Sequence, residues 1–175
     1  MVRFHKKITK KFNPSMIKIL EDFVDFFNDI KIDYWLGGGL LQCIINKRFG
    51  EIRKNWAEHD IDFHILAEDR QIIDRNIANL RSKGYQYEAF NNRILLNSKD
   101  GHRIELAILW PSHDPRILFF CAFGKKSVPH MKRKEIRKRS YHFDVPTEYF
   151  ANDYLQLEGL KIRIPNPEYI KFVYR

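Results

Sequence analysis

Two stretches decide the fold: YWLGGGLLQCIIN at residues 34–46 and DIDFHIL at residues 60–66. In the first, an apolar run ends in three glycines and a second apolar run follows, which predicts a buried strand, a glycine turn and a helix. Glycines let backbone N–H groups approach a phosphate closely, and a helix N-terminus favours negative charge. We therefore expect Gly37, Gly38 and Gly39 to cradle a phosphate; the alternative is a tight turn that needs glycine for steric reasons.

The second stretch places two carboxylates side by side. On a strand, residues two apart point to the same face, so Asp60 and Asp62 share one face. The apolar residues Ile61, Phe63 and Ile65 then point into the core. Two such carboxylates repel each other unless a cation lies between them, and their oxygens suit Mg²⁺ or Mn²⁺. Asp60 and Asp62 are the predicted metal ligands; the alternative is two surface acids beside a basic residue.

A third acid interrupts the apolar stretch HRIELAIL at residues 102–109. Glu105 is costly in the middle of an apolar strand unless it is paired or metal-bound. If its strand lies beside that of Asp60, Glu105 completes a cluster of three carboxylates and binds a second metal ion or acts as the base for an acceptor hydroxyl. Two metal ions held in this way stabilise the attacking and leaving oxygens of an in-line transfer. An ion pair with Arg103 and a surface position are the alternatives.

Two histidines flank the acids. His64 falls on the same strand face as Asp62, and His59 precedes Asp60. Each is a candidate for contacting substrate or acting as a base, with a polar surface histidine as the alternative. A zinc site is not expected, because no histidine or cysteine pair has zinc spacing.

The remaining patterns predict an α+β protein with a mixed β-sheet flanked by helices. Asn13 and Pro14 are suited to begin a first helix. Helices are expected over about residues 14–31, 40–46, 69–83, 147–154 and 168–174, and strands over 34–36, 60–66, 85–90, 93–97, 102–109, 116–123 and 160–164. We expect a single domain over residues 1–175, with an N-terminal helix at about 14–31, a catalytic core at about 34–110 and a basic C-terminal segment at about 111–175.

The glycine and Asp-Ile-Asp segments resemble those of the nucleotidyltransferase superfamily. Within it, the segments at residues 35–41, 60–62, 158–165 and 169–174 are most similar to the LicD/fukutin-like group. This resemblance implies a nucleotidyltransferase-like fold and an enzyme that moves a phospho-group from a nucleotide-activated, CDP-linked donor to a glycan hydroxyl.

A rival likeness is to the small antibiotic nucleotidyltransferases of the lincosamide and aminoglycoside type, which share a Gly-Gly, a His-x-Asp-x-Asp-like segment and a later strand acid. That likeness implies a nucleotide donor and a small-molecule acceptor. A third alternative is a catalytically inactive member that binds nucleic acid. We favour an enzyme, because an acidic trio repels nucleic acid.

The net charge of +9, from 31 basic and 22 acidic residues, suits an anionic partner. Lys47 and Arg48 follow the glycine turn closely and are predicted to bind donor phosphates. The basic run at residues 125–139 is expected to contact donor phosphates, an anionic acceptor or a membrane surface, or else to be a solvated face.

The chain carries features expected of a cytoplasmic protein. Cys43 and Cys121 lie in apolar surroundings and form no C-x-x-C pair, which predicts buried thiols in a reducing compartment. No apolar run approaches the length that spans a bilayer, so peripheral contact is the form of membrane association left open.

Overall fold

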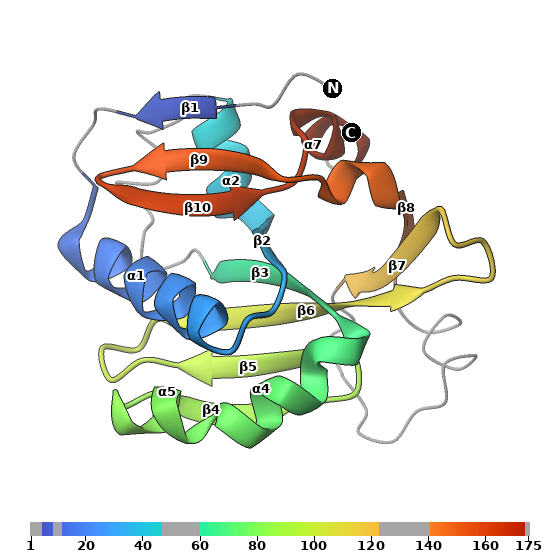
Figure 1. Ribbon diagram of the computed structural model, residues 1–175. Helices are drawn as coiled ribbons and strands as arrows, with labels where there is room; N and C mark the ends of the chain where they lie inside the picture. The colour runs from blue at the N-terminus through green and yellow to red at the C-terminus, as the bar shows by residue number, and fades with distance from the viewer. Residues whose placement is uncertain (1–4, 9–11, 47–59, 123–140, 174–175) are drawn as a thin grey trace.

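The computed structural model describes residues 5–8, 12–46, 60–122 and 141–173 (Figure 1). A mixed sheet forms its centre. The strands follow one another in the order β2 (Tyr34–Leu36), β3 (Ile61–Leu66), β6 (Arg103–Pro111), β5 (Arg93–Asn97) and β4 (Gln86–Ala89). The pair β3 and β6 is parallel, and the other neighbours in this order are antiparallel. The far end of β6 pairs with β7 (Ile117–Ala122), which pairs with β8 (Tyr141–Pro146).

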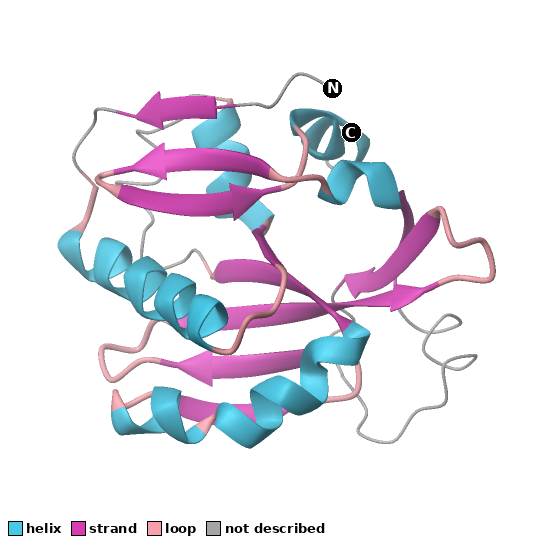
Figure 2. Cartoon of the chain, in the orientation of Figure 1, coloured by secondary structure: helices cyan, strands magenta, loops and turns pink. Residues whose placement is uncertain are grey.

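A second, three-stranded sheet occupies the upper part of the molecule in Figure 1. β9 (Asp153–Leu157) lies at its centre, parallel to β1 (His5–Ile8) and antiparallel to β10 (Leu160–Ile164). Buried side chains of both sheets belong to the same hydrophobic cluster. The expectation of an α+β architecture with a mixed sheet flanked by helices is confirmed (Figure 2).

Helix α1 (Pro14–Asp29) packs on one face of the main sheet. It begins as predicted: the Asn13 side chain accepts a hydrogen bond from the Ser15 N–H, and Pro14 takes the first position. Phe23 stacks on Phe63 of β3 at a ring distance of 5.7 Å. This aromatic contact shows that Phe63 lies on the face of β3 opposite to the one predicted to carry the metal-binding acids.

The predicted helix over residues 69–83 is interrupted. It consists of the short 3₁₀ helix η2 (Ala67–Asp69) followed by α4 (Arg70–Asn76) and α5 (Ala78–Ser82), with Ile77 between the last two. The inner face is the expected one, because Ile73, Ile77 and Leu80 are all buried. Gly84 ends the segment with a φ of +95°, a backbone conformation that favours glycine.

Three boundaries differ from the predictions. Helix α2 (Gly38–Ile45) begins two residues before the expected Leu40, because Gly38 and Gly39 form its first turn. The helix predicted over 147–154 is wrong beyond the short 3₁₀ helix η3 (Thr147–Phe150), since the following residues enter β9. β6 continues to Pro111, two residues past its predicted end.

The last helix, α7 (Pro167–Val173), lies where a terminal helix was predicted. Cys43 is buried within α2, as expected. Within the described ranges, every helix is too short or too polar to cross a membrane.

Candidate active site

The register of β3 and β6 brings two of the predicted acids together. Asp62 lies directly opposite Glu105 in this parallel pair, so the two side chains share one face of the sheet. Ile61 and Phe63 point to the other face and are completely buried. The period-2 pattern of the sequence therefore placed the acids correctly.

Asp62 is held at the N-terminus of α2. The backbone N–H of Gly39 donates to its carboxylate, and the N–H of Gly37 donates to its main-chain carbonyl at 2.8 Å. Its Oδ1 atom is buried and accepts no hydrogen bond from the residues that the structure describes. Burial, together with the charges of Glu105 and Asp60, raises the pKa of Asp62 well above its usual value. A buried carboxylate oxygen that lacks a donor is unfavourable unless a cation or a ligand supplies a partner.

The glycine turn makes room for the side chains of β3. Gly38 has a φ of +62°, and a Cβ atom there would lie 1.6 Å from Oδ2 of Asp62. A Cβ atom on Gly37 would lie 2.6 Å from Nε2 of His64. The steric need for glycine, which the sequence offered as the alternative, is therefore real, and the predicted phosphate cradle stays a prediction.

Glu105 is held by two arginines. It is 2% exposed, and its Oε2 atom lies 3.3 Å from a terminal nitrogen of Arg93 and 3.4 Å from one of Arg103. Arg103 also approaches Asp60, with 3.5 Å between Nε and Oδ2. Burial raises the pKa of Glu105 to about 7, although both guanidinium groups act to lower it. The ion pair with Arg103 that the sequence allowed is therefore present.

Sequence reasoning missed Arg93. The register pairs Glu105 with Leu95 on β5, and Arg93 lies two residues from Leu95 on the same face of the sheet. Strand alternation, once β5 is paired with β6, is the signal that finds it.

His64 lies inside the protein, so the alternative of a polar surface histidine is wrong for this residue. The side chain is 3% exposed, and its Nε2 atom lies 2.7 Å from the Tyr169 hydroxyl of α7. Its ring packs edge-on against Phe150 and Tyr169. His64 therefore connects the C-terminal segment to the strand that carries Asp62, and Tyr169 is a further residue that sequence reasoning missed.

A known structure shares this arrangement of elements. The lincosamide antibiotic adenylyltransferase LnuA, in its lincomycin-bound crystal structure, matches 95% of this chain and 88% of its own at a TM-score of 0.52 and 15% identity. The antibiotic-resistance factor ANT(2'')-Ia in solution matches 88% of this chain and 66% of its own at a TM-score of 0.49 and 15% identity. The chain has a nucleotidyltransferase-like fold. No protein family and no curated protein matches the sequence, so the likeness is one of fold.

Within this nucleotidyltransferase-like fold, the acids offer partial ligands for a metal ion. Among the residues that the structure describes, no three acidic, histidine or cysteine side chains are grouped closely enough to hold an ion as they lie. Arg103 lies within ion-pair distance of both Asp60 and Glu105, whereas Asp62 retains a buried oxygen that accepts no hydrogen bond within the described ranges. That oxygen is a hard donor of the kind that Mg²⁺ and Mn²⁺ prefer, so Asp62 fits a divalent ion.

Several predicted residues lie outside the described ranges: Lys47, Arg48, His59 and the basic run at 125–139. Their predicted contacts with donor, acceptor or membrane stay predictions. The LicD/fukutin-like likeness also stays a prediction.

The burial of His64 predicts a dependence of stability on pH. Burial lowers its pKa to about 4, from a usual value of 6.5. Between these values the unfolded chain binds a proton that the folded chain does not, so the free energy of unfolding decreases as the pH falls from 6.5 to 4. The decrease is about 3 kcal/mol at most. Urea unfolding at a series of pH values measures it.

A histidine pair supplies the control. The variant His64→Asn should lose this part of the pH dependence, whereas His113→Asn, at an exposed position, should keep it. An unchanged pH dependence in His64→Asn would show that His64 is accessible to protons in the folded state.

Proposed function

We propose that this chain is a divalent-metal-dependent nucleotidyltransferase that moves a nucleoside monophosphate from a nucleoside triphosphate to a hydroxyl group of a small molecule. The observation that carries the proposal is the buried Oδ1 of Asp62, which has no hydrogen-bond partner in the described part of the chain and whose residue lies opposite Glu105 in a parallel strand pair. The likeness of fold to an adenylyltransferase supports it.

Asp60 and Asp62 hold Mg²⁺, or Mn²⁺ in its place, in this proposal. The ion, when bound, neutralises the phosphate charge that develops during transfer. The backbone at Gly37, Gly38 and Gly39 and the side chains of Lys47 and Arg48 bind the donor phosphates. Arg103 is 38% exposed, so a donor phosphate can compete with Asp60 for its guanidinium group.

Glu105 is the proposed general base. A pKa of about 7 suits a group that must accept a proton near neutral pH. The oxygen of the acceptor hydroxyl forms a bond to the α-phosphorus, the bond from that phosphorus to pyrophosphate breaks, and the hydroxyl proton passes to Glu105. A second metal ion on Glu105 would be repelled by the guanidinium groups of Arg93 and Arg103, which both lie beside its Oε2 atom, so we prefer the base.

The acceptor is the point at which the two family likenesses differ. The LicD/fukutin-like likeness favours a CDP-linked donor and a glycan hydroxyl, whereas LnuA is a lincosamide adenylyltransferase whose structure contains lincomycin. The match to LnuA extends over nearly the whole chain. We therefore place the small-molecule acceptor ahead of the glycan.

A nucleotide panel tests the proposal. ATP, GTP, CTP, UTP and CDP-choline are each added with and without Mg²⁺, and the melting temperature is recorded, because a ligand of the native state raises it. Pyrophosphate release is then followed with the preferred triphosphate and lincosamide, aminoglycoside or sugar acceptors. We expect a Mg²⁺-dependent shift with one triphosphate and release that depends on a small-molecule acceptor. A shift with CDP-choline alone would favour the glycan alternative, and no shift with any nucleotide would contradict the proposal.

A further inference from the structure

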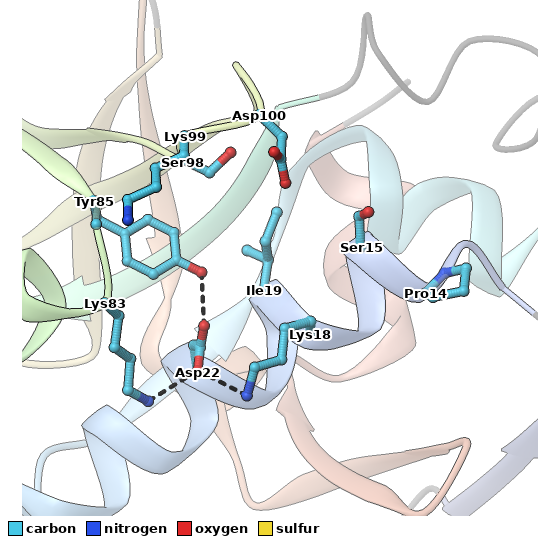
Figure 3. A pocket seen from close by; sticks show the side chains of 11 residues that line it. Pro14, Ser15, Lys18, Ile19, Asp22, Lys83, Tyr85, Ser98, Lys99 and Asp100 are labelled. Atoms are coloured by element: carbon cyan, nitrogen blue, oxygen red, sulfur yellow. Dashed lines mark hydrogen bonds and ion pairs between the residues drawn. The ribbon is translucent and has the colours of Figure 1, made fainter.

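A cavity of about 470 Å³ lies between the start of α1, the turn at Lys83 to Tyr85 and the β5–β6 hairpin (Figure 3). Its size falls in the range of small-molecule sites. Charged side chains form part of its wall beside apolar ones, and they include Lys18, Lys83 and Lys99.

The cavity lies on the opposite face of the sheet from the candidate active site. Tyr85 in its wall contacts Phe23 edge-on at a ring distance of 5.2 Å, and Phe23 stacks on Phe63. Phe63 points away from the face that carries Asp62. A ligand in the cavity therefore does not share the groups proposed for catalysis.

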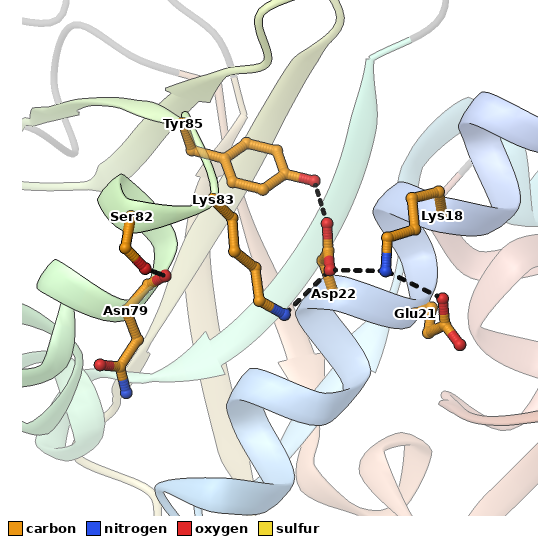
Figure 4. A network of polar contacts seen from close by, with 7 residues as sticks. All are labelled: Lys18, Glu21, Asp22, Asn79, Ser82, Lys83 and Tyr85. Atoms are coloured by element: carbon orange, nitrogen blue, oxygen red, sulfur yellow. Dashed lines mark hydrogen bonds and ion pairs between the residues drawn. The ribbon is translucent and has the colours of Figure 1, made fainter.

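A buried carboxylate organises one wall of the cavity (Figure 4). Asp22 is 6% exposed and accepts hydrogen bonds from the Tyr85 hydroxyl at 3.0 Å and from Lys83 Nζ at 2.9 Å. Lys18 Nζ lies 3.3 Å from the same carboxylate and 3.2 Å from exposed Glu21. Asp22 therefore holds two ammonium groups at the wall, and both keep N–H donors for a further partner because each ammonium has three.

Lys99 adds a third positive charge from the hairpin. Its side chain passes over Gly84, where a Cβ atom would lie 2.2 Å from Cε of Lys99. Within the described ranges, Lys99 forms no ion pair with a carboxylate. The first turn of α1, whose Ser15 lines the cavity, carries no acidic residue to offset the helix dipole.

The charges on the wall favour an anion. Three lysines and two aspartates, Asp22 and Asp100, line the cavity; Glu21, outside the wall, pairs with Lys18, so Lys83, Lys99 and the helix N-terminus supply the positive side. Lysine ammonium groups and helix N-termini both bind phosphate oxygens. We propose that this cavity is a second binding site, for a small phosphate-bearing molecule held by Lys83 and Lys99 with support from Lys18.

Calorimetric titration tests this site, with pyrophosphate, glucose 6-phosphate and AMP as probes and sulfate as the comparison anion. It is carried out on the wild type and on Asp62→Asn, which removes the proposed metal ligand. We expect at least one phosphate compound to bind both proteins with similar affinity and more tightly than sulfate. The preferred probe distinguishes a sugar phosphate from a nucleotide or pyrophosphate.

Methionine substitutions then locate the binding. Methionine keeps an aliphatic chain but carries no charge, so Lys99→Met preserves the cover over Gly84 and leaves the Asp22 network intact. We expect Lys99→Met together with Lys83→Met to weaken binding about tenfold or more. The control combines Lys31→Met and Lys171→Met, two lysines that do not line the cavity.

The titrations distinguish binding in the cavity from binding at the candidate active site. Unchanged affinity in both Lys99→Met and the double variant would overturn the proposal, as would binding lost in Asp62→Asn, which would assign the ligand to the active site. Sulfate binding as tight as that of every phosphate compound would also overturn it, because the cavity would then hold an adventitious ion only. Failure of nucleotidyl transfer would not affect the result, since the cavity shares no residue with the proposed catalytic groups.

Discussion

Replacing Asp62 with asparagine is expected to lower nucleotidyl transfer roughly 1,000-fold and to leave the protein at least as stable as the wild type. Asparagine keeps the shape of the side chain and the acceptor for the Gly39 N–H, but it removes the negative charge that would hold the metal ion. Loss of that ion removes several kcal/mol of transition-state stabilisation, which corresponds to about this factor.

The expected stability of Asp62→Asn follows from the raised pKa of Asp62 in the wild type. A carboxyl group whose folded pKa lies above its unfolded value contributes most to stability below the unfolded pKa, and this contribution is lost as the pH rises through the folded pKa. At neutral pH the wild type therefore carries a penalty that asparagine does not. Urea unfolding at pH 7 without divalent ions measures this difference.

The matched control is Asp29→Asn at the exposed end of α1, where both activity and stability should stay close to those of the wild type. Added Mg²⁺ should raise the melting temperature of the wild type and of Asp29→Asn, but not that of Asp62→Asn. Activity of Asp62→Asn within threefold of the wild type would refute the metal role. A large loss of stability would show that the carboxylate has a structural partner.

Patterns local to one strand or helix were predictable from the sequence. The alternation of Asp60 to Ile65 set which side chains of β3 face the core, and Asn13 with Pro14 set the start of α1. Such patterns depend on the period of the backbone and on hydrogen bonds between residues a few positions apart. The residues that determine them are therefore neighbours in the sequence.

Contacts between distant segments were not predictable in this way. The first two residues of β9, Asp153 and Tyr154, were assigned to a helix because their strand depends on pairing with β1, where Tyr154 lies opposite His5. His64 was placed on the correct face, but the sequence does not show that Tyr169, 105 residues later, covers it. In both cases an element far along the chain decides the environment.

Within the candidate site, the contacts of Arg93 and Gly38 were not predictable for the same reason. The acids at Asp62 and Glu105 were expected to meet, but Arg93 joins Glu105 only through the register of β5 with β6. Gly38 was singled out for a phosphate, whereas in the structure the space that a Cβ atom on it would need is taken by the Asp62 carboxylate. Both contacts depend on the pairing of strands that lie apart in the sequence. The spacing of apolar and polar residues within one strand or helix does not reveal such pairing.

Gly38→Ala is expected to abolish detectable transfer and to lower the free energy of unfolding by about 3 kcal/mol. The positive φ accounts for about 1–2 kcal/mol for any residue with a Cβ atom, and the overlap with Asp62 Oδ2 adds a comparable term. Gly159→Ala, in the β9–β10 turn, is the matched control, because its φ of +91° imposes the same kind of strain while a Cβ atom there meets nothing within 4 Å. We expect it to cost about 1 kcal/mol and to retain activity.

A double-mutant cycle separates the overlap from the backbone strain. In the background of Asp62→Gly, the oxygen, Cγ and Cβ atoms of Asp62 that would meet the new Cβ atom are all absent, so Gly38→Ala should cost about as little as Gly159→Ala. The difference between its cost in the two backgrounds measures the contact between Gly38 and Asp62. If Gly38→Ala costs the same in both, the clash is relieved elsewhere, and the glycine at this position serves the turn rather than the carboxylate. A large difference would instead establish that the turn at Gly38 is shaped around the acid that we propose binds the metal.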